Sequence, residues 1–344
     1  MKMINLLSDT VTQPTDEMRT AMANAIVGDD VTRDDPTINK LEAMSAERMG
    51  KEAGLFIPSG TMGNLLALMC HCGRGEEVIL GNDTHTFLFE AGGSAVLASV
   101  PAYPIETMED GTLPLHAIKD AIRAEDVHCP VSRLIVLENT HNRKAGVSLS
   151  AAYTQQVADL AKENRLLLHI DGARIFNAAI DQNCDVTDLV APADSVTFCL
   201  SKGLCAPVGS VLCGSEEFIA NARHARKMLG GGMRQAGILA AAGIISLEKM
   251  VDRLVEDHER AHTLAEAIRG MSGAVVNEVV QHTNMIYLYF NEDSPINAYE
   301  VADKLKEKGI LAGATAEHSM RLVTHYWIDD ADIADTINAF KDVL

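Results

Sequence analysis

The sequence predicts an α/β fold, with a mainly parallel sheet in a large domain and a smaller α+β domain at the C-terminal end. Between residues 41 and 250, short strand-like runs alternate with helical segments. Several of these runs are apolar throughout, which is typical of strands covered on both faces. After about residue 250, the alternation gives way to charged helices and a few strands.

The expected elements follow one another along the chain. Residues 1–40 are polar and irregular, and we expect an N-terminal arm with a short helix. In the large domain, 41–250, we expect helices at 61–71 and 151–163, and strands at 55–60, 77–81, 95–100, 133–139, 166–172, 195–200 and 209–214. In the small domain, 251–344, we expect helices at 252–269 and 298–308, strands at 285–290 and 320–328, and a closing helix capped by Asp329 or Asp330.

The chain is strongly acidic, since 29 Lys and Arg against 48 Asp and Glu give a net charge of −19. Such a surface repels nucleic-acid phosphates and anionic lipids, so we expect neither as a partner. No signal peptide is expected, and no stretch approaches the roughly 18 apolar residues of a membrane helix. Because Cys70 and Cys72 have no second pair at zinc spacing, we expect reduced thiols in a cytoplasmic protein and no metal site.

The segment PSGTMGN, residues 58–64, joins an expected strand to an expected helix. The backbone N–H groups of Gly60 and Thr61 can approach an anion at the helix N-terminus, and Thr61 adds a hydroxyl. Taken alone, the same pattern also fits an ordinary turn.

Two further segments place charged residues directly after apolar runs. In HIDGAR, Asp171 can cap a helix, bind a metal or face a protonated ring nitrogen, and Arg174 can bind a carboxylate or lie in solvent. In TFCLSKGLCAPVGS, Lys202 is either an ordinary strand-end lysine or an amine available for Schiff-base chemistry.

Together, the turn, the acid and the lysine supply the three anchors that pyridoxal phosphate needs. They offer an anion site for the phosphate, a carboxylate for the pyridinium N–H and an amine for the aldehyde carbon. His85, in GNDTHTFLFEAGG, adds a flat ring suited to stacking on the pyridine. We therefore expect pyridoxal 5′-phosphate as the cofactor.

Almost end to end, the sequence resembles the low-specificity L-threonine aldolase and L-allo-threonine aldolase family, which has the aspartate-aminotransferase-like fold (fold type I) of pyridoxal-phosphate enzymes. The motifs that carry the resemblance are LLSDTVTQPT, DDPTINKLE, IPSGTMGN, LENTHN, HIDGAR, LSKGLCAPVGS and RKMLGGGMRQAG. One segment departs from the family pattern DDVYGEDP, because this chain reads DDVTRDDP, with Thr32 and Arg33 in place of Tyr and Gly. The resemblance puts that segment near the active-site rim, so substrate preference or subunit contacts could differ.

The resemblance implies a role for each matching residue. It makes Lys202 the Schiff-base lysine, Asp171 the pyridinium partner and His85 the stacking ring. The implied phosphate ligands are Gly60, Thr61, Arg234 and Lys227, the last two reaching in from a neighbouring subunit. The implied substrate-carboxylate ligands are Ser8, Arg174 and Arg321, and His128 is implied to face the substrate hydroxyl.

The implied reaction is cleavage of L-threonine or L-allo-threonine to glycine and acetaldehyde, in a homotetramer that is a dimer of dimers. Three readings compete with it: an aldolase for another β-hydroxy amino acid such as phenylserine, a β-eliminating lyase, and a non-catalytic binding module. The base for the β-hydroxyl is left open between His85, His128 and a bound water. Glu90 either orients His85 or simply packs.

Overall fold

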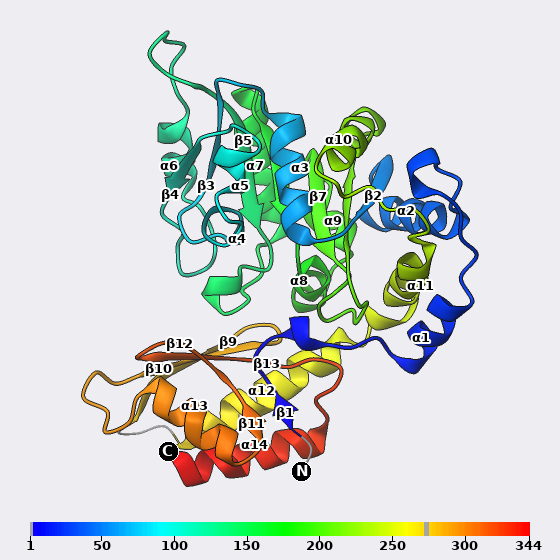
Figure 1. Cartoon of the computed structure of the whole chain (residues 1–344). Helices are drawn as coiled ribbons and strands as arrows, with labels where there is room; N and C mark the ends of the chain where they lie inside the picture. Colours follow the sequence, from blue (N-terminus) through cyan, green and yellow to red (C-terminus); the bar gives the residue numbers. More distant parts are fainter. Residues whose placement is uncertain (1–2, 272–274) are drawn as a thin grey trace. The chain divides into compact units, whose positions relative to one another are not determined.

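A computed structural model describes residues 3–271 and 275–344 of the chain (Figure 1). Its contacts divide the chain into two compact units. The larger is Pro14–Val251, and the smaller combines the described residues of Met1–Gln13 and Asp252–Leu344. The predicted domain limits at residues 40 and 250 stay a prediction. Among the described residues, no helix has both the length and the apolar character needed to cross a membrane.

The larger unit is built around a seven-stranded sheet. In spatial order its strands are β2 (Ala53–Ile57), β8 (Ser210–Gly214), β7 (Ser195–Cys199), β6 (Leu167–Asp171), β5 (Val131–Glu138), β3 (Glu76–Gly81) and β4 (Ala102–Ile105). β8 runs in the opposite direction to the other six strands, so the sheet is mainly parallel. The predicted α/β fold is confirmed.

Helices of the larger unit connect and cover these strands (Figure 1). They are α1 (Asp16–Ala23), α2 (Pro36–Met49), α3 (Gly60–His71), α4 (His85–Leu88), α5 (Gly93–Val96), α6 (Leu115–Ala121), α7 (Ala151–Glu163), α8 (Ile175–Gln182), α9 (Val186–Val190), α10 (Glu216–Met228) and α11 (Gly237–Ile245), with short 3-10 turns at Asp30–Thr32 and Asn142–Lys144 and a π-helical turn at Ser246–Met250. Apolar side chains of α3 and α10 pack together on β2 and β8. The far end of α3 packs on β3 and β5.

The strand predicted at 95–100 is wrong. Its first residues belong to the short helix α5, and the edge strand β4 begins only at Ala102. Val96 is 76% exposed and Leu97 is 54% exposed, whereas Val100 at the end of the run is buried in the core. The edge position of β4 explains how it tolerates Pro104, since proline cannot donate a hydrogen bond to a second neighbour.

The smaller unit holds the helices α12 (Leu254–Met271), α13 (Ala298–Glu307) and α14 (Asp330–Val343), and a 3-10 turn at Asp9–Val11. Its antiparallel sheet has the order β12 (Gly313–Ala316), β13 (Ser319–Val323), β10 (Met285–Phe290) and β9 (Val276–Gln281). Asp329 caps α14 and completes a capping box with Asp332. The strand expected at 320–328 ends at Val323.

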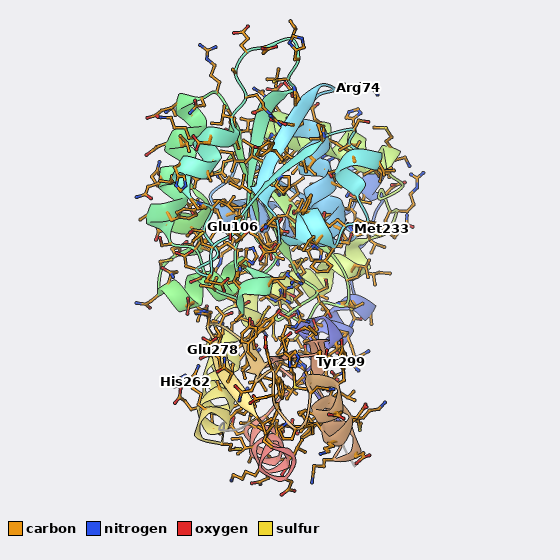
Figure 2. The ribbon with its side chains drawn as sticks, turned by 90° about the vertical axis from the view of Figure 1, so that its left-hand side faces the viewer. Arg74, Glu106, Met233, His262, Glu278 and Tyr299 are labelled. Carbon is orange, nitrogen blue, oxygen red and sulfur yellow. The ribbon has the colours of Figure 1, made fainter. Side chains whose placement is uncertain are left out.

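A second, two-stranded sheet joins the two ends of the sequence within the smaller unit. β1 (Ile4–Asn5) pairs in parallel with β11 (Ile310–Leu311). Ile4, Leu6 and Ile310 enter the same apolar core as α12, α13 and α14. The exposed side chains of His262 and Tyr299 mark the outer faces of α12 and α13 (Figure 2).

Candidate active site

Asp171 and Lys202 lie at the same edge of the seven-stranded sheet. Asp171 is the last residue of β6, where it pairs with Thr197 of β7, and Lys202 follows the end of β7 by three residues. Asp171 is buried, and Lys202 is half-buried. Arg174, also buried, follows Asp171 at the start of α8. This edge is the usual place for ligands in open α/β sheets.

The carboxylate of Asp171 is fixed by neutral donors. Its Oδ2 atom accepts hydrogen bonds from Nδ2 of Asn64 at 2.8 Å and from Oγ1 of Thr86 at 3.3 Å. Its Oδ1 atom accepts from the backbone N–H of Ala173 at 3.3 Å. These contacts orient the group without cancelling its charge, which suits a carboxylate that faces a cationic partner.

His85 begins the short helix α4, close to Asp171 and Lys202. Its backbone N–H donates to Oε2 of Glu138 at 2.6 Å, and its Nδ1 atom lies 2.9 Å from Oε1 of Glu90. The bond to Glu90 is the main cause of the raised pKa of His85; burial and the charge of Lys202 act against it, and the charge of Asp171 acts with it. Glu90 therefore orients His85, which resolves the alternative left open by the sequence.

Gly60 brings the N-terminus of α3 to the same edge as Lys202. β2 and β7 run in the same direction, because both are antiparallel to the strand β8 between them. A Cβ atom at Gly60 would lie only 3.0 Å from Sγ of Cys199, the last residue of β7. The absence of a side chain thus lets the turn close on the strand end, while Thr61 beside it is exposed.

These residues fit pyridoxal phosphate. The N-terminus of the 12-residue helix α3 offers N–H donors and positive potential to a phosphate. The oriented carboxylate of Asp171 suits a ring N–H, and Lys202 supplies a primary amine at the adjoining strand end. All three lie at one edge of one sheet.

The residues predicted to bind the substrate carboxylate fall in both units. In the smaller unit, Ser8 caps a 3-10 turn, and Nη2 of Arg321 donates to the carbonyl oxygen of Leu7 at 3.1 Å. Ser8 and Arg321 are therefore close together. Arg174 lies beside Asp171 in the larger unit.

His128 lies away from this edge within its own chain. It is in the segment that leads into β5, its side chain is 86% exposed, and its Nδ1 atom is 2.7 Å from Oδ1 of Asp126. Since β5 and β6 are parallel, the start of β5 is at the opposite edge of the sheet from Asp171.

Lys227 and Arg234 are also exposed. Lys227, in the last turn of α10, lines a pocket of about 350 Å³ together with Arg33 and Gly232. Nη1 of Arg234 is 2.8 Å from Oδ2 of Asp29. Both side chains are therefore accessible to a second protein molecule or its ligand.

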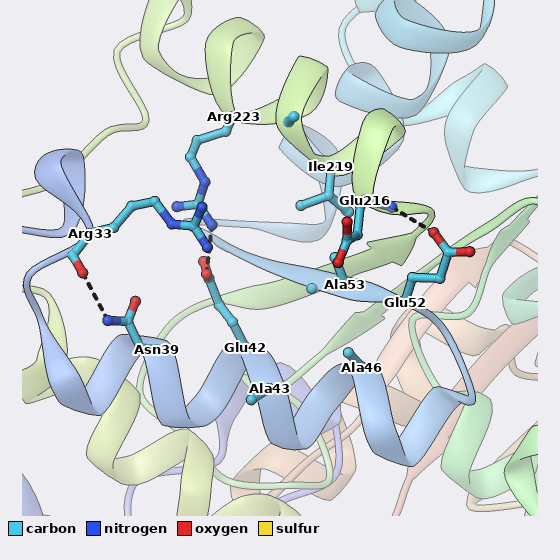
Figure 3. A pocket seen from close by; sticks show the side chains of 12 residues that line it. Arg33, Asn39, Glu42, Ala43, Ala46, Glu52, Ala53, Glu216, Ile219 and Arg223 are labelled. Carbon is cyan, nitrogen blue, oxygen red and sulfur yellow. Dashed lines mark hydrogen bonds and ion pairs between the residues drawn. The ribbon is translucent and has the colours of Figure 1, made fainter.

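Arg33, one of the two departures from the family motif, also lines a second pocket of about 570 Å³ between α2, β2 and α10 (Figure 3). Arg33 has a left-handed backbone conformation, with φ of 65°. One ion pair crosses this pocket, between Nη2 of Arg223 and Oε2 of Glu42 at 2.6 Å. None of the residues that line the pocket belongs to the group around Asp171.

Sequence reasoning missed the groups behind the carboxylate. Asn64 and Thr86 both bond Asp171, and Asn64 also donates to Oε1 of Glu90 at 2.8 Å. One signal was available, since Asn64 is a polar residue inside the apolar pattern of α3, one turn after Gly60. A buried amide needs partners, which makes such a position informative.

Comparison with known proteins identifies the family. A family model described as "Beta-eliminating lyase" matches residues 5–291. Low-specificity L-threonine aldolase 1 of Arabidopsis thaliana is 46% identical over 347 residues, which cover 100% of this chain and 97% of the relative. The low specificity L-threonine aldolase of Escherichia coli K12 is 46% identical over 333 residues, 97% of either chain. This chain belongs to the low-specificity L-threonine aldolase family.

The fold agrees with that membership. A structure of Leishmania major threonine aldolase superposes with a TM-score of 0.84 at 18% identity, covering 98% of this chain and 99% of the other. Members of the threonine aldolase family are pyridoxal-phosphate-dependent carbon–carbon lyases. The predicted enzyme class and cofactor are thereby confirmed.

Proposed function

We propose that this threonine aldolase family member cleaves L-threonine and L-allo-threonine to glycine and acetaldehyde, with pyridoxal phosphate attached to Lys202. The observation that carries the proposal is the meeting of His85, Asp171 and Lys202 at one sheet edge beside the glycine turn. The chain offers these groups in a sequence that is 46% identical to low-specificity L-threonine aldolases along its whole length.

When bound, pyridoxal phosphate draws electrons away from the substrate bond that breaks. In this proposal, the N–H groups of Gly60 and Thr61 hold the phosphate, and Asp171 keeps the ring nitrogen protonated. Lys202 would supply the amine that holds the aldehyde carbon of the cofactor. Arg234 and Lys227 add positive charge near the phosphate from a neighbouring subunit.

The substrate carboxylate is held by Ser8, Arg174 and Arg321 in this proposal. A guanidinium binds a carboxylate through two parallel hydrogen bonds, which fixes rotation as well as position. Fixing that rotation aligns the Cα–Cβ bond for cleavage, so the clamp contributes to rate and not only to affinity.

The proton of the β-hydroxyl needs a base. His85 meets the requirement, because its Nδ1 side faces Glu90 and its other ring nitrogen, Nε2, can accept a proton. His128 belongs to the opposite sheet edge of its own chain, so it can act only from a second copy. A bound water is the third candidate.

The proposed assembly is a cytoplasmic homotetramer made of two dimers with shared active sites. Exposed apolar side chains follow His85 on α4 and α5, namely Phe87, Leu88, Phe89, Val96 and Leu97. A cluster of this kind on a soluble protein is suited to burial against another chain. Reduced thiols at the seven cysteines would agree with this proposed cytoplasmic location.

A visible spectrum of the purified protein, recorded before and after addition of L-allo-threonine, tests the cofactor and the substrate class together. We expect a cofactor band that changes with the amino acid, and acetaldehyde as the product. The second candidate is β-elimination, favoured by the "Beta-eliminating lyase" family model. Ammonia formed in place of aldehyde would replace the aldolase proposal with this one. Faster cleavage of phenylserine than of threonine would indicate an aldolase for another β-hydroxy amino acid.

A further inference from the structure

A chain of buried polar side chains leads away from Asp171 into the larger unit. Oδ1 of Asn64 lies 3.2 Å from Nε2 of His169. Nδ1 of His169 lies 2.8 Å from Oγ of Ser195, and the same Oγ lies 2.7 Å from Nε2 of His71. The ring of His71 stacks on Phe218 at 4.3 Å.

Each of these polar side chains is buried. The exposed fraction is 2% for Asn64, 1% for His169, 0% for Ser195 and 9% for His71. A buried polar group that loses its partner costs about 1–3 kcal/mol, so the hydrogen bonds among these residues are constrained to be mutually consistent.

The two carboxylates set the direction of every bond. In their ionised forms the carboxylates of Glu90 and Asp171 can only accept, so one hydrogen of the Asn64 amide points at each of them. Oδ1 of Asn64 must then accept, which puts the proton of His169 on Nε2. Nδ1 of His169 in turn accepts from the hydroxyl of Ser195.

The last bond follows from the same rule. The Ser195 hydroxyl has one hydrogen, already given to His169, so its oxygen accepts from Nε2–H of His71. Both rings are neutral in this arrangement. Burial lowers the pKa of His169 to about 4, against the attraction of Asp171 and a hydrogen bond with the backbone of Ser195. Burial also lowers the pKa of His71 to about 3, with help from His169 and Arg133.

We propose that Asn64 and His169 are positioning residues. The single amide of Asn64 fixes the carboxylates of Asp171 and Glu90, and His169 holds that amide in place. Ser195 and His71 keep His169 in one protonation arrangement. The inference rests on the proposed roles of Asp171 and His85 toward the cofactor. Through Asp171 the amide orients the partner of the ring nitrogen, and through Glu90 it orients His85. One residue of α3 thus sets two of the groups around the cofactor.

Neutron diffraction from deuterium-exchanged crystals of the cofactor-free protein at pH 7 tests the arrangement directly. We expect deuterium on Nε2 of His169 and of His71, none on Nδ1 of His169, and the hydroxyl deuterium of Ser195 directed at His169. Deuterium on Nδ1 of His169, or a doubly protonated ring, would overturn the proposal. This measurement needs neither activity nor bound cofactor.

Three variants of the cofactor-loaded protein test the positioning role. Asn64→Leu and His169→Phe remove the donors, whereas His169→Gln keeps an amide N–H near the position of Nε2. We expect Asn64→Leu and His169→Phe to weaken cofactor binding by about ten- to a hundredfold, by analogy with the loss of hydrogen-bond partners behind metal ligands. We expect His169→Gln to restore most of this affinity. His224→Gln, on the exposed face of α10, is the matched control.

A spectroscopic readout separates positioning from general stability. We expect the pH midpoint of the visible absorption change of the bound cofactor to move by about one unit in Asn64→Leu, a tenfold change in that proton equilibrium. It should stay in place in His169→Gln and His224→Gln. An unmoved midpoint and unchanged affinity in Asn64→Leu would refute the role. A wild-type protein without a cofactor band would instead refute the proposed function and leave the neutron result standing.

Discussion

Nδ1 of His85 lies 2.9 Å from Oε1 of Glu90, and the same carboxylate oxygen accepts a bond from Asn64. Burial raises the pKa of Glu90, although the bond to His85 works against this. The bond to Glu90 raises the pKa of His85, so the protonation state of His85 depends on a residue that the substrate need not touch. The pH dependence of the reaction is therefore a probe of this pair.

Replacing Glu90 by Gln should move the acid limb of the kcat/KM profile to lower pH. A base must be unprotonated to act, and the loss of the carboxylate lowers the pKa of His85, so the active form persists further into acid. A pH series with L-allo-threonine measures the limb. Glu109→Gln, at an exposed glutamate, is the control. If the acid limb of the kcat/KM profile does not move, its pKa belongs to a group other than His85.

Lys202→Ala should abolish the cofactor adduct that borohydride fixes to the protein, because the variant lacks the amine to which the proposal attaches the cofactor. Mass spectrometry of the reduced protein measures the adduct. Lys162→Ala, on the exposed face of α7, should retain a full adduct. A stable adduct in the Lys202 variant would move the attachment point elsewhere.

Arg174→Ala should remove nearly all turnover, because the clamp aligns the bond as well as binding the carboxylate. The loss should appear in kcat and in kcat/KM, measured by steady-state kinetics of aldehyde release. Arg19→Ala, at an exposed arginine of α1, is the control. A near-normal kcat with only a raised KM would show that Arg174 contributes binding but not alignment.

The cofactor-free protein should lose stability as the pH falls from 6.5 toward 5. The rings of His169 and His71 take up protons in the unfolded chain below about pH 6.5, but in the folded protein only near pH 4 and 3. The unfolded state therefore gains protons first, which costs up to about 1.4 kcal/mol per pH unit for each ring. His85 and His141 have raised pKa values and act with the opposite sign.

Urea unfolding of the wild type and of His169→Gln at pH 7.5, 6.5 and 5.5 isolates the contribution of one ring. The variant should show the shallower loss of unfolding free energy across this range. Equal slopes for the two proteins would show that His169 takes up its proton equally in both states.

Arg226→Leu should destabilise the fold by up to about 3–5 kcal/mol, because the buried carboxylate of Asp30 loses its nearer cation. It keeps Arg223, whose Nη1 atom lies 3.5 Å from Oδ1 of Asp30. Nη2 of Arg226 lies 2.7 Å from Oδ2 of Asp30, and the two residues are 2% and 1% exposed. The double variant Asp30→Asn, Arg226→Leu should recover part of the loss. Urea midpoints of the three proteins measure it. No recovery in the double variant would point to lost packing.

Local patterns in the sequence predicted most of the strands, several helices and the residues at strand ends. The apolar runs predicted six of the seven strands of the main sheet. They also placed Asp171 and Lys202 at or just beyond strand ends, and neighbouring parallel strands bring these ends to one edge. The prediction at 95–100 failed, because an apolar run does not reveal which of its residues are buried: Val96 is exposed and Val100 is buried.

Non-local relationships were beyond the sequence. Nothing in the order of residues shows that Asn64 reaches across 107 positions to Asp171, or that His169 lies behind it. The motif match assigned His128 to the substrate. Only the direction of β5 shows that, within one chain, His128 lies at the sheet edge opposite to Asp171. Such pairings depend on sheet order, which periodicity does not encode.

The pairing of β1 with β11 joins Ile4 and Asn5 to Ile310 and Leu311. During translation, at roughly 5–20 residues per second, Ile4 and Asn5 leave the ribosome about 15–60 s before their partner strand is made. A ribosome stalled before residue 310 would therefore carry a nascent chain in which the β1 segment still lacks its partner strand. Chaperones that capture emerging N-termini would find it available for nearly the whole of synthesis.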